Sequence, residues 1–233
     1  MMTFPILFSN VKQLRMGSLL LAAWLLPAWG HAQKFYGTSD GEFILGFANI
    51  RRNGLEEPSV PRLSVFFHGQ SLLHLDAGRR HGFFTGLSLR NVGFIYDESD
   101  LIRKKSRTYN VGIPVAIKVG NMDRRFLFAG YALEVPINYK EKTFVGGEKR
   151  DKFNYWFSRR VNAINHTLFV GVRLPHGASF RFTYYLTPFF NKDFETLNAQ
   201  GQRERPYQDF NVHLFHFSLA KMITKEKKLY VWD

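Results

Sequence analysis

The sequence predicts an all-β protein: an eight-stranded antiparallel up-and-down transmembrane β-barrel, preceded by a cleavable signal peptide. Three observations predict this fold. Eight segments alternate bulky apolar residues with small or polar ones, as strands with two different faces do. The connections between these segments are alternately long and short. An apolar stretch near the N-terminus has the features of an export signal.

The N-terminal stretch is interpreted as a signal peptide because of the order of its residue types. Lys12 and Arg15 precede the apolar run 17–29, and the small residues Gly30 and Ala32 follow it. The run has 13 residues, whereas a membrane-spanning helix needs about 20. We therefore expect export and cleavage after Ala32. The predicted organisation is a signal peptide (1–32), an outer-membrane β-barrel (33–220) and a basic C-terminal tail (221–233).

Composition limits the chemistry and the partners. The 233 residues suffice for one all-β domain and contain 24 Phe and 10 Tyr but no Cys. The lack of Cys excludes disulfides, a thiol nucleophile and a lipid-modified cysteine. Loss of residues 1–32 removes Lys12 and Arg15, which lowers the formal charge from +13 to +11. Because an exported protein does not meet nucleic acid, we expect its anionic partners to be outer-membrane lipid and lipopolysaccharide.

The predicted strands are separated by connections that alternate in length. Most strands reach the 9–11 residues that a tilted transmembrane strand needs. The successive gaps are 10, 5, 12, 6, 25, 4 and 17 residues. Short turns at one end and longer loops at the other are typical of outer-membrane barrels. The predicted strands are 42–51, 62–76, 82–95, 108–119, 126–139, 165–174, 179–190 and 208–220.

The two faces of each strand indicate which side meets lipid. In 108–119, one face carries Tyr109 and five aliphatic residues, and the other is small or polar and ends with Lys118. The bulky face fits lipid, and the small polar face fits the narrow interior of an eight-stranded barrel. A two-layer sandwich also has one apolar face per strand and stays open as an alternative. In the last strand the alternation shifts at Leu214 and Phe215, which predicts either a bulge there or a misplaced strand boundary. Aromatic residues near strand ends predict an interfacial girdle of Tyr109, Tyr139, Tyr155, Trp156 and Tyr184.

One strand also carries a family resemblance. Tyr109, Ile113, Pro114 and Lys118 in "YNVGIPVAIKVG", followed by "FLFAGYALEVPINY", resemble the PorT-like outer-membrane β-barrel proteins of Bacteroidetes. The resemblance covers most of the chain after residue 32. It implies an eight-stranded barrel in a Gram-negative outer membrane and a possible connection with type IX secretion proteins.

Neither a metal site nor a catalytic site is predicted, and no cofactor is expected. His213 and His216 are three residues apart, which places them on opposite faces of a strand. His68 and His74 could share a face, but they lack ligands at a suitable spacing. The candidates for an enzyme at the barrel rim do not form a nucleophile, base and orienting group. These candidates are Asp97, Ser99, Asp100 and His166.

Charged residues on the inward faces predict a polar interior. Lys118 and Glu134 lie on adjacent predicted strands, so we expect them to pair across the wall of the barrel. Such charges could line a selective pore, or they could form an ion-paired plug in a barrel too narrow to conduct. The size of the barrel favours the plug. The predicted lumen charge network is Arg90, Lys118, Glu134, Arg173 and Arg181.

The longest predicted loop, 140–164, is the candidate binding region. It combines basic and aromatic residues, which are common at binding sites, although the same residues could anchor the membrane interface. We predict a non-enzymatic structural or accessory component of an outer-membrane assembly, which binds other outer-membrane or secretion proteins through this loop. The alternatives are a narrow channel or ligand-binding barrel, and thirdly an outer-membrane enzyme. The candidate loop residues for a partner or lipopolysaccharide are Lys149, Arg150, Lys152, Tyr155, Trp156, Phe157, Arg159 and Arg160.

Overall fold

The computed structural model describes residues 33–198, 200–224 and 227–232, and the described part consists of strands, turns and one short 3-10 helix. The predicted signal peptide lies outside the described residues. Among the described residues no helix is long and apolar enough to cross a bilayer. The strands are β1 (Gln33–Arg52), β2 (Leu55–Glu57), β3 (Ser59–Val60), β4 (Arg62–Ser64), β5 (Gly69–Asp76), β6 (His81–Ser99), β7 (Ile102–Asn121), β8 (Arg125–Val145), β9 (Glu148–Trp156), β10 (Asn165–Arg173), β11 (Ala178–Tyr185), β12 (Thr196–Leu197), β13 (Arg203–Glu204), β14 (Phe210–Met222) and β15 (Lys227–Trp232). The 3-10 helix is η2 (Pro175–Gly177).

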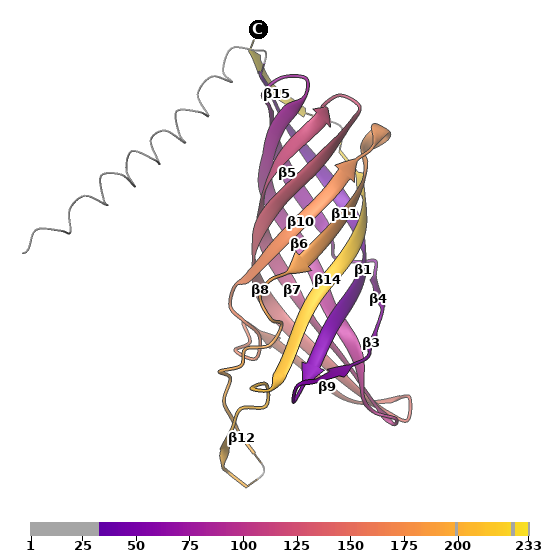
Figure 1. Ribbon diagram of the computed structural model, residues 1–233, viewed down its shortest axis with the longest axis vertical. Coiled ribbons are helices and arrows are strands. Elements are labelled where there is room, and N and C mark those ends of the chain that lie inside the picture. Colours follow the sequence, from indigo (N-terminus) through magenta and orange to yellow (C-terminus); the bar gives the residue numbers. More distant parts are fainter. Residues whose placement is uncertain (1–32, 199, 225–226, 233) are drawn as a thin grey trace, which may run out of the picture.

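Eight strands form a closed antiparallel barrel (Figure 1). Their order around the ring is β1, β5, β6, β7, β8, β10, β11 and β14. The ring is complete because β10 pairs with β8 and β14 pairs with β1. Each barrel strand therefore lies beside the barrel strands that precede and follow it in the sequence. This arrangement confirms the predicted eight-stranded up-and-down barrel.

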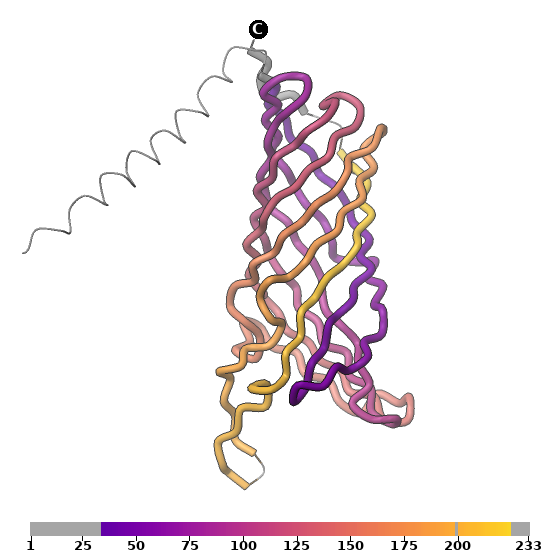
Figure 2. The backbone as a smooth tube through the Cα atoms, viewed as in Figure 1, coloured from indigo at the N-terminus to yellow at the C-terminus, as the bar shows by residue number. Residues whose placement is uncertain are grey.

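The two ends of the barrel differ as the sequence predicts. The end with short connections holds the turns 77–80, 122–124 and 174–177, and β15 pairs with the start of β1 there. We call this the turn end. The opposite end, here called the loop end, carries the longer connections and the projecting β12–β13 hairpin (Figure 2). The range predicted as a C-terminal tail thus contains the end of β14 and the strand β15.

Several predicted boundaries are wrong at the loop end. The predicted loop 96–107 belongs mostly to β6 and β7, which continue to a tight connection at 100–101. The predicted loop 140–164 contains the end of β8 and all of β9, which form a hairpin. The predicted strand 62–76 is divided into β4 and β5. These extensions are mainly polar and carry only scattered aromatic residues such as Phe144 and Phe153, so they lack the regular alternation that identifies a strand.

Inward-facing side chains fill the barrel in successive layers. An apolar cluster that includes Phe94, Tyr139 and Phe190 lies toward the loop end. A second cluster, with Phe84, Phe128 and Met122 among its members, lies toward the turn end. Buried charged residues lie between and beside these clusters. Tyr139 is buried in the interior, so its predicted place in an outer aromatic girdle is wrong.

The predicted bulge in the last strand is wrong as well. β14 alternates regularly and pairs with β1 and β11 without a shift in register. Its inward residues change from Val212 and Leu214 to His216 and Ser218. The apparent change of phase at Leu214 and Phe215 therefore marks the boundary between the apolar and polar layers inside the barrel.

Candidate functional site

A buried ion network occupies the middle of the lumen. Arg90 donates from Nε to Glu42 Oε2 at 3.1 Å and from Nη1 to Glu134 Oε1 at 3.1 Å. Its Nη2 donates to Gln70 Oε1 at 3.2 Å, and Arg181 Nη2 donates to the same oxygen at 2.8 Å. Arg181 also pairs with Glu42 at 3.3 Å. Four strands, β1, β6, β8 and β11, thus contribute the charged groups at this level of the lumen.

Two further ion pairs lie toward the turn end. Lys118 pairs with Asp76 and lies 3.3 Å from His74 Nδ1. Arg173 pairs with Asp40 at 3.2 Å. The predicted pairing of Lys118 with Glu134 is therefore wrong. Gly112 is the residue of β7 that faces Glu134, six residues along the strand from Lys118.

The five charged residues of the predicted lumen network are all buried: Arg90, Lys118, Glu134, Arg173 and Arg181. The sequence does not identify their acidic partners. Asp40 precedes the predicted first strand (42–51), and Glu42 is its first residue. The limits of that strand follow from its apolar residues alone, so the predicted network omits these two carboxylates. The alternation of Thr38, Asp40 and Glu42 with small residues was the available signal, because it places both carboxylates on one strand face.

A group of aromatic side chains, here called the plug, lies inside the barrel at the loop end. The connection between β11 and β14 folds inward and places Phe189 and Phe190 inside the barrel. Phe190 stacks on Tyr207 with ring centroids 4.2 Å apart and meets Phe94 edge-on at 6.0 Å. The backbone N–H of Phe189 donates to the carbonyl of Val212 at 2.7 Å. The plug is thus fixed both to the wall and to the returning loop.

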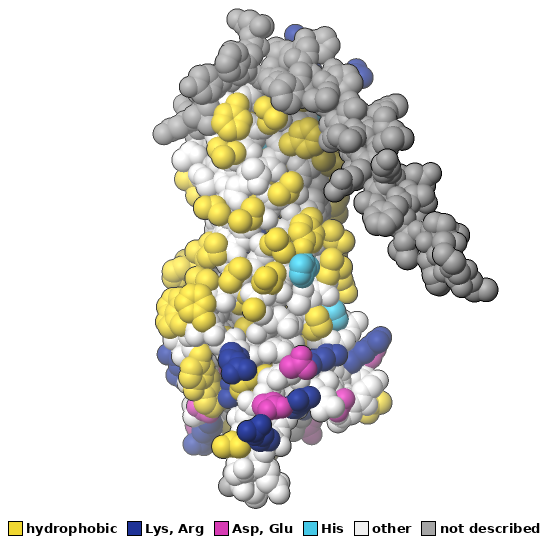
Figure 3. Space-filling view, turned by 90° about the vertical axis from the view of Figure 1, so that its left-hand side faces the viewer, with side chains coloured by type: hydrophobic (Ala, Val, Ile, Leu, Met, Phe, Trp, Pro, Cys, Tyr) yellow, Lys and Arg dark blue, Asp and Glu magenta, His cyan; other side chains and the backbone are white. Residues whose placement is uncertain are grey.

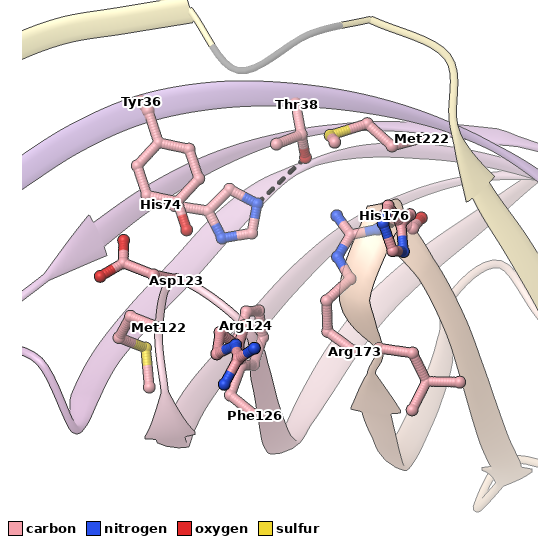
Figure 4. A pocket seen from close by; sticks show the side chains of 12 residues that line it. Tyr36, Thr38, His74, Met122, Asp123, Arg124, Phe126, Arg173, His176 and Met222 are labelled. Atoms are coloured by element: carbon pink, nitrogen blue, oxygen red, sulfur yellow. Dashed lines mark hydrogen bonds between the residues drawn. The ribbon is translucent and has the colours of Figure 1, made fainter.

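A cavity of about 590 Å³ opens at the turn end. Figure 4 shows Tyr36 and His74 on one side of this cavity, which is also lined by Arg124 from the turn 122–124 and by Arg173 at the end of β10. His74 is hydrogen-bonded to Thr38, with 3.0 Å between Nε2 and Oγ1. The cavity is lined by basic, aromatic and thioether groups and by the carboxylate of Asp123, and its two arginines could hold a small anionic ligand.

The outward faces of the barrel strands form an apolar band. Val115 in the middle of β7 is 57% exposed, and large apolar side chains on the other barrel strands are exposed to a similar degree. Figure 3 shows these side chains over the wall of the barrel, with the charged side chains gathered toward the loop end. The band includes Phe43, Leu45, Leu73, Phe83, Leu87, Ile113, Val115, Ile117, Leu127, Leu133, Leu168, Val170, Phe180, Phe217 and Leu219.

The structure does not gather the candidate loop residues into one site. Lys149, Arg150, Lys152 and Tyr155 lie on β9, and Trp156 at its end is 67% exposed. Phe157 follows and donates its N–H to the carbonyl of Ile137. Arg160 instead turns toward the plug, where its Nη1 donates to Tyr207 Oη at 3.1 Å. Arg159 accepts a hydrogen bond at its carbonyl from Asn191.

The residues considered for catalysis lie apart. Asp97 and Ser99 belong to β6 and Asp100 to the following connection, whereas His166 lies outward on β10 against Tyr131. Asp97 pairs with Arg103 at 2.6 Å, and this contact lowers the pKa of the Asp97 carboxyl. His213 and His216 lie on opposite faces of β14, as predicted. Within the described ranges no group of His, Cys, Asp and Glu could hold a metal ion.

No protein-family model and no curated protein matches the sequence. Among solved structures, Ail, the attachment invasion locus protein of Yersinia pestis, in complex with the heparin analogue sucrose octasulfate, is similar at 10% identity and a TM-score of 0.35, with 82% of this chain and 97% of that chain covered. Neisserial surface protein A is similar at 9% identity and a TM-score of 0.36, covering 82% and 98% respectively. The outer membrane protein OprG from Pseudomonas aeruginosa is similar at 8% identity and a TM-score of 0.33, with 81% of this chain and 95% of that chain covered. At these values the similarities carry no conclusion about what this chain binds.

Proposed function

We propose that the protein is an outer-membrane β-barrel with a closed lumen, which acts as a non-enzymatic structural or accessory component and presents its loop-end hairpins outside the membrane. The observation that carries this proposal is the distribution of side chains across the wall. Val115 and Ile117 face outward and are more than half exposed, whereas Arg90, Lys118 and Glu134 are buried inside.

This distribution is the reverse of the one expected for a barrel in water. A soluble barrel buries its bulky apolar side chains and exposes its charges. An apolar band around the whole wall is far larger than the apolar patches of soluble monomers, and a lipid bilayer supplies a partner of matching extent. The same argument disfavours a ligand-binding barrel in the periplasm.

Heat-modifiability tests the membrane assignment. The mature protein is taken from isolated outer membranes, and its gel mobility is compared before and after boiling. A mobility shift together with extraction by detergent alone supports a folded membrane barrel. Recovery of the protein in the soluble fraction, with no shift, contradicts it.

Conductance tests the closed lumen. The Arg90 network and the Phe190 plug fill the interior at two levels, so the refolded barrel should show no ion steps in a planar bilayer. Stable steps would replace the structural role with that of a narrow channel.

The resemblance to PorT-like barrels extends the proposal to a partner. It suggests that the loop end contacts other outer-membrane or type IX secretion proteins, and the residues that carry it are Tyr109, Ile113, Pro114 and Lys118. Cross-linking from Trp156 or Phe157, both exposed on the outer rim, would identify such proteins. Retrieval of no outer-membrane or secretion protein would contradict this extension.

The cavity at the turn end favours a second candidate, a binding site for a small anion. Arg124 and Arg173 border this space together with Asp123. Asp40 pairs with Arg173 and Asp123 lies 4.0 Å from Lys34, so Arg124 has no ion pair among the described residues. Thermal stabilisation of the barrel by a panel of small carboxylates and phosphates, abolished by Arg124→Gln, would support this function. No stabilisation by any member of the panel would oppose it.

A further inference from the structure

The outward face of β7 changes character in three steps along one strand. From the turn end toward the loop end it carries a run of aliphatic residues that finishes at Val111, then Tyr109, and then Arg107 and Lys105. All these residues have the same parity in an unbroken strand, so they point to the same side of the wall. In a membrane this order corresponds to hydrocarbon, interface and headgroup.

Neighbouring strands extend the basic part of this face sideways. Lys105 is directly opposite Lys142 on β8, and Lys142 is directly opposite Lys152 on β9. Arg107 is likewise opposite Lys140. We call these residues, together with the adjacent Lys149, the cationic face: Lys105, Arg107, Lys140, Lys142, Lys149 and Lys152.

The nearby carboxylates do not neutralise the cationic face. Asp97 pairs with Arg103. Glu141 lies on the other side of β8 and accepts hydrogen bonds from Tyr139 and Ser106. Within the described part of the chain no ion pair involves any member of the cationic face. Like charges directly opposite one another destabilise a sheet, and an anion bound to this face would relieve their repulsion.

Local electrostatics agree with this arrangement. Partial burial lowers the pKa of Lys140, and the charges of Arg107, Lys152, Lys142 and Lys149 lower it further. The pKa of Lys142 is lowered by burial and by the charges of Arg107, Lys149, Lys152 and Lys105. Two members of the face are held in position by aromatic rings: Lys105 lies 4.8 Å from the ring of Phe144, and Arg107 lies 5.5 Å from that of Tyr109.

The position of the face selects the kind of anion. Arg107 lies four residues beyond Val111, which corresponds to a height of about 10 Å above the apolar band at the usual rise and tilt of a barrel strand. That is the region of lipid headgroups. A soluble partner would be expected on the tips of the hairpins, whereas this face points sideways, in continuity with the lipid-facing residues.

We propose that the cationic face binds the phosphate groups of lipopolysaccharide in the outer leaflet. This rests on the outer-membrane barrel proposed above, with its short turns in the periplasm and its longer loops at the cell surface. The middle row, Lys105, Lys142 and Lys152, supplies the ammonium groups that meet one phosphate cluster. Arg107 and Lys140 form the row closer to the hydrocarbon. Of the eight loop residues predicted from sequence, only Lys149 and Lys152 belong to this site, and four of its members lie on β7 and β8.

The test compares two triple variants that each lose three positive charges. The first, Lys105→Gln/Lys142→Gln/Lys152→Gln, removes the middle row. The control, Arg51→Gln/Lys192→Gln/Arg203→Gln, removes exposed cations elsewhere at the loop end. Each barrel is refolded in a zwitterionic detergent free of lipopolysaccharide, and binding of diphosphoryl lipid A and of its fully dephosphorylated form is measured by thermophoresis.

We expect the apparent Kd for diphosphoryl lipid A to rise at least about tenfold in the middle-row variant and less than about twofold in the control. Removal of the lipid phosphates should weaken wild-type binding by a similar factor and leave the variant unchanged, since both changes remove the same contact. Equal affinity of the wild type and the middle-row variant for diphosphoryl lipid A would overturn the proposal. The proposal would also be overturned if the middle-row variant lost affinity for the dephosphorylated lipid by the same factor as for diphosphoryl lipid A.

Two further measurements separate the possible failures. Soluble sulfated polysaccharide is titrated in parallel, and a middle-row effect on this ligand alone would assign the face to a glycan and reject the lipid. Gel mobility before and after boiling is recorded for every preparation. A heat shift in all variants combined with unchanged lipid binding rejects the cationic-face proposal alone, whereas a wild type that shows no shift rejects the membrane barrel itself.

Discussion

Arg90 and Glu42 form a fully buried ion pair across the lumen, with 3.1 Å between Nε and Oε2. Glu42 also pairs with Arg181, and Arg90 also pairs with Glu134. Each charge is thus compensated by more than one partner, which offsets the desolvation of a charge in the interior. The network fixes the positions of β1, β6, β8 and β11 relative to one another.

Neutralising Glu42 should destabilise the barrel strongly. Glu42→Gln leaves Arg181 without its carboxylate partner and Arg90 with only Glu134, and breaking a buried pair destabilises proteins by about 3–5 kcal/mol. Urea titration of the refolded barrel measures the free energy of unfolding. The matched control is Glu56→Gln, whose exposed pair with Arg51 should contribute no more than about 1 kcal/mol. Equal losses for the two variants would contradict the network.

A lysine in the middle of the apolar band distinguishes lipid from water. Val115→Lys should destabilise a barrel in a bilayer by about 2–4 kcal/mol. In water the same exposed position would tolerate lysine within about 0.5 kcal/mol. Leu197→Lys, on the projecting β12–β13 hairpin, is exposed to a similar degree and serves as the control. A small effect at both positions would argue against lipid contact.

Truncation of the plug should weaken the loop end without opening the lumen. Phe190→Ala removes a buried ring that stacks on Tyr207, and such changes destabilise proteins by about 3–5 kcal/mol. Ion conductance should remain absent because the Arg90 network still fills the middle of the barrel, on the turn-end side of the plug. Phe66→Ala, at an exposed ring, should change the free energy of unfolding little. Ion steps in the Phe190 variant alone would show that the plug is the only barrier.

Neutralising one lysine of the cationic face should stabilise the β8–β9 hairpin. Lys142→Gln removes a charge opposite both Lys105 and Lys152, so amide hydrogen exchange in 140–156 should slow when no lipopolysaccharide is present. Lys192→Gln, outside the face, should leave this exchange unchanged. Faster exchange in Lys142→Gln would contradict mutual repulsion.

The same repulsion predicts a dependence on pH. Because the pKa of Lys142 is lowered in the folded protein, the unfolded chain binds more protons at alkaline pH, and stability rises with pH there. The gain should begin as pH rises through the lowered pKa and be complete above the unfolded value of 10.5. Hairpin protection, corrected for intrinsic exchange, should therefore increase over this interval in wild type and less in Lys142→Gln.

The position and the facing of a strand are predicted best where one of its faces is regularly apolar. In β7 the aliphatic run is long and regular, so the strand, its outward face and the inward position of Lys118 are all predictable. The partner of Lys118 is not, because Asp76 lies on a strand two places away around the ring. Pairing across a closed barrel depends on tilt and register, which local alternation does not specify.

Strand length beyond the membrane is also poorly predicted. The extensions of β6, β7 and β8, and the whole of β9, are mainly polar. The row formed by Lys105, Lys142 and Lys152 therefore cannot be recognised until the strand register is known. The inward position of Phe189 and Phe190 is equally hard to predict. A short aromatic pair in a loop has the same local sequence pattern whether it faces lipid or the lumen. These features depend on contacts between distant parts of the chain.

The pairing of β1 with β14 has a consequence for biogenesis. Asp40 lies opposite Met222, and Arg52 lies opposite Phe210, so the first strand of the ring receives its second neighbour only when the last one is in place. Until then β1 and β11 each have an open edge, and such edges invite pairing with other chains. Contacts between such distant residues also form slowly. Docking of β14 between β11 and β1 is therefore the step that removes both open edges at once.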